Sequence, residues 1–146
     1  MSHVAPTDKT AGALIARGLD SPVVMLNLLK FRDIADYGGA PPGLAPTHPI
    51  SGAAAYDLYA AAIAPRLDAS GGEVLFEGIG GEWFIGPEGD GWDRVLLVRQ
   101  ASVGAFLAFA QDPEAARAGH HRTAALADSR LLPLSPRTPP RDPRTP

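Results

Sequence analysis

The spacing of apolar residues along the chain predicts four helices and four strands. Apolar residues at helical spacing after a capping residue predict helices over residues 8–17 and 52–69, a helix after Ser102, and a short helix from Asp112-Pro113 to about Gly119. Apolar runs bounded by turn residues predict strands over residues 23–31, 73–86, 94–100 and 129–134, the last at a sheet edge because of Pro133. Pro65 is expected to kink or restart its helix, and Gly78, Gly80 and Gly81 indicate a bulge or bend in the second strand.

After the first helix the predicted order is strand, helix, strand, strand, helix, strand. This βαββαβ order is typical of a ferredoxin-like α+β fold, in which helices cover one face of an antiparallel sheet. The strand over residues 23–31 is apolar on both faces, so the face away from the helices also needs a cover. A lid, the N-terminal helix or a second copy can provide it, and we expect a homodimer packed sheet to sheet.

Glycine and proline are abundant, with 16 and 15 residues, and they divide the chain. Residues 1–21 form an N-terminal helix and lead-in, residues 22–134 the ferredoxin-like domain, and residues 135–146 a Pro/Arg-rich tail that we expect to be disordered. The insertion over residues 32–51 has two interpretations, a lid or pocket wall and a mobile surface loop.

Composition and charge narrow the function classes. The net charge is −3 and the pI about 5.7, so we expect no nucleic-acid partner. The absence of cysteine excludes disulfides, thiolate metal sites and a cysteine nucleophile. No targeting segment or membrane span is visible in the sequence, and a cytoplasmic protein without a membrane partner is expected.

Four stretches carry a family resemblance: PVVMLNLLKF (22–31), SGAAAYDLYAAAIAP (51–65), GWDRVLLVRQASVGAFLAF (91–109) and HRTAALADSRLL (121–132). Together they resemble the bacterial domain-of-unknown-function 1330 family. The resemblance implies a ferredoxin-like subunit that pairs into a dimeric α+β barrel. It implies no reaction, because similar barrels include antibiotic-biosynthesis monooxygenases and muconolactone isomerases, whose activities differ.

The sequence lacks the common nucleotide, zinc-protease and serine-hydrolase motifs, and we expect no cofactor and no metal. Asn27 is an amide inside an apolar strand, which is costly unless it holds a neighbouring loop or faces a ligand. Lys30 follows at the strand end, where it is solvated, paired or an anion contact.

Aromatic residues supply further candidates for substrate binding. Tyr56 and Tyr59 are three residues apart on a helix, so both phenols can reach one side, either as core residues or at a ligand. Trp83 and Trp92 flank a turn-rich loop and either wall a pocket for a flat apolar compound or serve as core or dimer contacts.

His121 is the candidate general base, because an unperturbed imidazole has a pKa of about 6.5. Asp128 or Glu77 would orient it, and Asn27, Tyr59 or Arg122 would polarise a substrate oxygen. The sequence thus predicts a protein that handles an apolar or aromatic small molecule, as a cofactor-independent enzyme for isomerisation, proton transfer or oxygenation. The alternative is a non-catalytic binding or accessory subunit in which these residues are structural.

Overall fold

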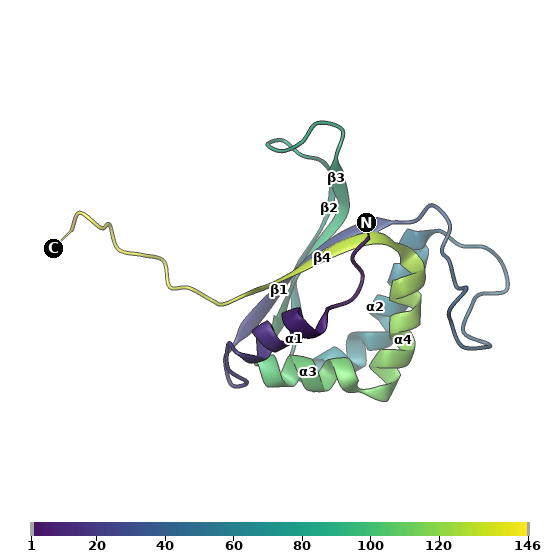
Figure 1. Ribbon diagram of the computed structural model, residues 1–146, viewed down its shortest axis with the longest axis horizontal. Helices are drawn as coiled ribbons and strands as arrows, with labels where there is room; N and C mark the ends of the chain where they lie inside the picture. The colour runs from purple at the N-terminus through teal and green to yellow at the C-terminus, as the bar shows by residue number, and fades with distance from the viewer. Residues whose placement is uncertain (1, 146) are drawn as a thin grey trace.

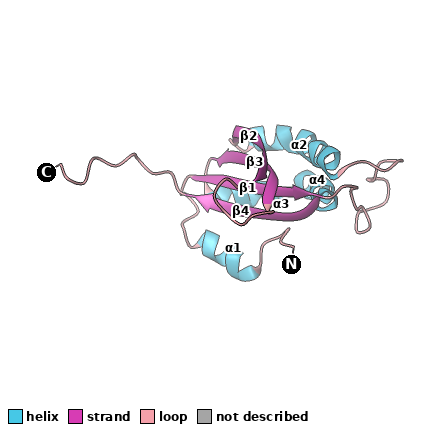
Figure 2. Ribbon diagram, turned by 90° about the horizontal axis from the view of Figure 1, so that it is seen from above, coloured by secondary structure: helices cyan, strands magenta, loops and turns pink. Residues whose placement is uncertain are grey.

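The computed structural model describes residues 2–145 and contains four helices and four strands. The helices are α1 (Asp8–Ile15), α2 (Gly52–Ala69), α3 (Val103–Gln111) and α4 (Pro113–Ala125), and the strands are β1 (Val23–Phe31), β2 (Glu73–Glu82), β3 (Gly91–Gln100) and β4 (Leu126–Leu134). The strands form one sheet in the order β2-β3-β1-β4, and all pairs are antiparallel. Helices α2, α3 and α4 lie on one side of this sheet (Figures 1 and 2), which confirms the ferredoxin-like α+β prediction.

The helix starts follow the capping residues. Thr7, Ser51, Ser102 and Asp112 each accept a hydrogen bond from a backbone N–H of the first turn. Helix α4 continues past Gly119 to Ala125, so the predicted end was wrong and both His120 and His121 are helical. Glycine inside a helix costs only about 0.5–1 kcal/mol relative to alanine, so α4 can continue through Gly119.

Other local expectations also need correction. Helix α2 is unbroken at Pro65, so the helix does not restart there; Pro65 and Ala61 are both exposed, and water can solvate the carbonyl that the proline leaves without a donor. Strand β2 ends at Glu82, and its register shift lies between Val74 and Phe76 rather than at the glycines. Strands β3 and β4 each begin three residues earlier than predicted.

The core between sheet and helices consists of two clusters. One centres on Leu29, Tyr56 and Leu96, and the other on Met25, Leu14 and Val103. On β1, Asn27 lies between Met25 of the second cluster and Leu29 of the first. A polar residue therefore stands where the apolar core divides.

The opposite side of the sheet, which we call the open face, carries apolar residues without a cover from the described part of the chain. It includes Leu26 and Leu28 of β1, their β3 partners Leu97 and Val95, and Leu132 of β4. Helix α1 packs through Leu14 on the helix side, and Tyr37 and Ile50 of the 32–51 insertion pack against the Leu29 cluster. Neither the N-terminal helix nor the insertion, which was the candidate lid, therefore covers the open face, and a second copy is the remaining candidate.

Beyond β4, residues 135–145 contain no helix or strand and extend away from the body (Figure 1). The described helices include none that is both long and apolar enough to cross a membrane.

Candidate functional site

The sheet separates the residues singled out from the sequence into two groups. Asn27, Tyr56, Tyr59, His121 and Arg122 lie on the helix side. Lys30, Trp83 and Trp92 lie together at the open face. A single site that uses all of them is therefore excluded.

On the helix side, two phenols meet a guanidinium. The rings of Tyr56 and Tyr59 from α2 are 5.4 Å apart. The half-buried Arg122 of α4 donates from Nη1 to the carbonyl oxygen of Val4 at 2.9 Å, which holds its guanidinium in place. Burial and the neighbouring Tyr59 raise the pKa of Tyr56 to about 12, although the positive charges of Arg122 and Arg94 oppose the shift. Burial also raises the pKa of Tyr59, so both phenols remain protonated hydrogen-bond donors at neutral pH.

The two hydroxyl groups are available to a ligand. Within residues 2–145 neither forms a hydrogen bond to the protein, although both side chains are largely buried. The enclosed polar atom without a partner is Gln100 Oε1, which means that the phenol oxygens still touch accessible space. Two donors beside a cation form an arrangement that can bind a carbonyl or carboxylate oxygen.

Arg94 belongs to the same cluster, and sequence reasoning missed it. Its guanidinium lies 4.8 Å from the Phe31 ring centroid and 5.7 Å from that of Tyr56, and it donates to Asp57 Oδ1 at 2.8 Å. The alternation of side chains along β3 could have identified it, because residues two apart in a strand share a face and Arg94 therefore lies on the same face as Leu96.

Asn27 is only 8% exposed, and its Nδ2 donates to the Met25 carbonyl oxygen at 3.3 Å. Because this bond is local, Asn27 holds no neighbouring loop through it. The amide lies between the two core clusters, and neither pocket near the β2–β3 hairpin is lined by it.

His121 pairs with the insertion. Its Nδ1 lies 2.7 Å from Tyr37 Oη, and the two rings meet edge to face at 5.5 Å. Neither expected carboxylate orients the ring: Asp128 accepts from the backbone N–H groups of His3 and Ser129 and from Arg130, and Glu77 is exposed on β2. Tyr37 was missed as an orienting group because its hydroxyl is brought to α4 only by the path of the insertion.

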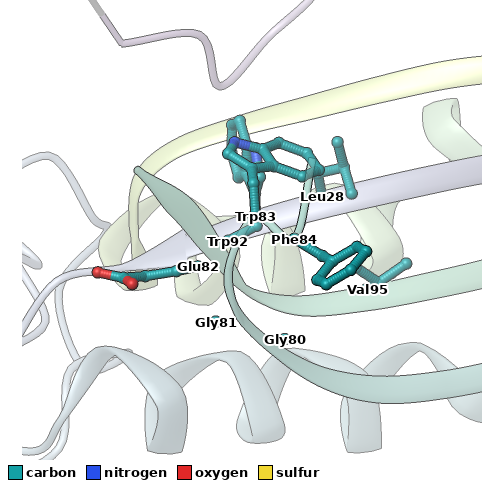
Figure 3. Close-up of a pocket in the computed structure, with 8 residues that line it drawn as sticks. All are labelled: Leu28, Gly80, Gly81, Glu82, Trp83, Phe84, Trp92 and Val95. Carbon is teal, nitrogen blue, oxygen red and sulfur yellow. The ribbon is translucent and has the colours of Figure 1, made fainter. Parts of the chain in front are cut away.

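At the open face, Asp90 connects two of the predicted residues. It accepts from Lys30 Nζ at 2.7 Å and from Trp83 Nε1 at 3.3 Å, and these hydrogen bonds lower its pKa. Lys30 Nζ also lies 4.7 Å from the ring centroid of Trp92. The adjoining pocket has a volume of about 280 Å³, and Trp83, Phe84, Leu28 and Val95 are among its lining residues (Figure 3).

Within residues 2–145, no group of three or more histidines and carboxylates is arranged to hold a metal ion.

Comparison with known proteins identifies relatives of unknown function. No protein-family model matches the chain, and no curated protein does. The crystal structure of RPA0582, a protein of unknown function from Rhodopseudomonas palustris, is 33% identical, covers 95% of this chain and 100% of its own, and superposes with a TM-score of 0.81. The methylated RPA0582 protein gives 34% identity, 96% and 98% coverage, and a TM-score of 0.83. At this identity and coverage, the chain belongs to the same family as RPA0582 of Rhodopseudomonas palustris.

Proposed function

We propose that this protein binds a small apolar or aromatic compound that carries a carbonyl or carboxylate oxygen, between the sheet and the helices. Tyr56, Tyr59 and Arg122 hold the oxygen, and the ligand's apolar part lies toward Asn27. One observation carries the proposal: two largely buried phenols without a hydrogen-bond partner in residues 2–145 lie beside a cation. Phenylalanine would fill nearly the same volume at both positions, and the two hydroxyl oxygens touch accessible space, so both hydroxyl groups are available as donors to a ligand.

A thermal-shift screen of aromatic and short-chain carbonyl and carboxylate compounds tests this binding. A compound at 100 times its Kd stabilises a protein by about 2.7 kcal/mol. We expect Arg122→Gln to weaken the binding of a hit by about 10- to 100-fold, because hydrogen bonds to charged groups contribute about 1.5–3 kcal/mol. Tyr59→Phe should weaken it less.

The matched control is Arg66→Gln. Arg66 pairs with Glu114 on the surface between α2 and α4, at 2.6 Å, away from the two phenols. A hit that shifts the melting temperature of all variants equally would contradict the proposed site.

Acid–base catalysis without a cofactor is the second candidate, and the environment of His121 favours it. Burial and the nearby charges of Arg117 and His120 lower its pKa, so the ring is neutral at neutral pH. A ring that donates Nδ1–H to Tyr37 Oη leaves Nε2 free to accept a proton. Isomerisation or proton exchange next to a carbonyl is the reaction class that such a base can perform.

Deuterium exchange into a bound carbonyl compound, followed by NMR, separates this candidate from a non-catalytic binding or accessory role. We expect His121→Gln to abolish exchange and to keep the thermal shift. Exchange that persists in this variant, or that is absent from the wild type with every ligand found, would support the binding protein instead.

We also propose that the chain forms a homodimer through the open face, and that its family is the domain-of-unknown-function 1330 family. The half-buried apolar row of Leu26, Leu28, Val95 and Leu97, which neither α1 nor the insertion covers, supports the dimer. Native mass spectrometry at micromolar concentration should show a dimer, and monomer alone would refute it.

A further inference from the structure

The hairpin between β2 and β3 ends in apolar side chains that no described part of the chain covers. We call residues 80–93 the arm. Phe84 is 99% exposed, Ile85 86% and Trp83 42%. Figure 1 shows the arm standing out from the body with its tip bent away from the helices. An aromatic side chain contributes about 150–250 Å², so the tip alone approaches the ~300–600 Å² of the largest apolar patch on a typical monomer.

The arm is held in place at its base. Asp90 binds both Lys30 of β1 and Trp83, and the Trp83 backbone N–H donates to the Asp90 carbonyl at 3.2 Å. Gly80 and Gly91 let the two strands approach closely, because a Cβ at either position would clash with the backbone oxygen of Trp92 or Gly81. A fixed presentation of exposed apolar groups reduces the entropy cost of binding.

The same molecule offers a complementary surface beside the arm. The pocket of about 280 Å³ shown in Figure 3 lies where the arm leaves the open face. Leu28 and Val95 of the open face line one part of it, and the arm supplies the other six lining residues, Trp83 and Phe84 among them. The arginines of the open face, Arg99 and Arg130, already pair with Glu73 and Asp128 of the same chain, so the contact surface offered there is the apolar one. A protrusion and a matching pocket on one molecule close a symmetric pair when each copy supplies both.

We propose that the arm of one copy lies on the open face of a second copy, where Phe84 and Ile85 enter its apolar pocket. The exchange is reciprocal, so each pocket, which is walled on one side by its own arm, receives the arm tip of the other copy. This inference rests on the proposed homodimer and names the contact that makes it.

Sedimentation equilibrium of the double variant Phe84→Ser/Ile85→Ser tests the contact. Both side chains are exposed in the protomer, so the variant should fold with unchanged circular dichroism. We expect its dimer Kd to rise by about 30-fold or more, which is the effect of losing an interface hot spot. The matched control, Ile34→Ser in the 32–51 insertion, removes a 60% exposed apolar side chain and should leave the Kd unchanged.

Disulfide trapping gives a second, independent readout, because the chain has no cysteine of its own. A Phe84→Cys chain mixed with a Leu28→Cys chain should form a mixed disulfide, and an Ile34→Cys chain should not. A dimer that forms with unchanged Kd in the double variant and gives no mixed disulfide would overturn the arm contact and leave the homodimer standing. A wild type that stays monomeric would overturn both, whereas ligand binding on the helix side is measured separately.

Discussion

His121 shows how tertiary environment changes the chemistry of a single residue. The sequence identified it as a candidate general base, but its partner, Tyr37, is 84 residues away. Burial and the nearby positive charges lower the pKa of His121 below its ordinary value of 6.5. Because the unfolded chain takes up a proton near 6.5 and the folded chain only at lower pH, acid favours unfolding across that interval.

We therefore predict that the melting temperature falls as the pH decreases from 7.5 through 6.5 toward the lowered pKa of His121. The variant His121→Gln should lose this part of the pH dependence. Differential scanning calorimetry measures the melting temperatures, and the NMR titration of the His121 ring provides the pKa directly. A ring pKa above 6.5 in the folded protein would contradict the prediction.

Glycines show how the same residue acts differently in different elements. Gly52 begins α2 where the chain passes β1 and α4, and a Cβ there would clash with the carbonyl oxygen of Arg32 and meet that of Ala125. Gly119 lies inside α4, and a Cβ there would meet no atom within 4 Å. In an open helix interior, alanine is favoured over glycine because the unfolded glycine has more conformational entropy to lose.

We predict opposite effects for alanine at these two positions. Gly119→Ala should stabilise the fold by about 0.5–1 kcal/mol, and Gly52→Ala should destabilise it by about 1–3 kcal/mol through backbone overlap. Urea denaturation measures both free energies of unfolding. If both substitutions changed the free energy of unfolding equally and with the same sign, helix propensity would explain the effects, and the contacts of α2 with β1 and α4 would not.

At the scale of the whole molecule, the tail stands apart from the folded body. In residues 135–145 the hydrogen bonds join only Asp142 to Arg144 and Thr145. The tail's three arginines against one aspartate also make the remaining body more acidic than the net charge of −3 suggests.

Removal of residues 135–146 should therefore leave the melting temperature unchanged to within about 1 °C, since the tail contributes no contact to the core. A pronounced loss of stability in the shortened chain would reveal a contact of the tail with the body or with a second copy. Measurement at two protein concentrations distinguishes those two cases, because only the second depends on concentration.

The sequence by itself determined the elements, their order and thereby the fold. Capping residues and the spacing of apolar residues are local signals, which is why β1 and the starts of all four helices were predicted correctly. The predicted end of α4 was wrong because Gly119 is typical of a helix end but is also tolerated inside a helix, and the register shift of β2 lies at Val74 rather than at its glycines.

Only the tertiary structure decided which candidate residues act together. Alternation along β1 already places Asn27 and Lys30 on opposite faces, but nothing local indicates which face the helices cover or where the arm and the insertion run. The fold places the phenols with Arg122 on one side of the sheet, and Trp83 and Trp92 with Lys30 on the other. Pairings such as Tyr37 with His121 depend on the path of the chain between distant elements, and local patterns carry no information about that path.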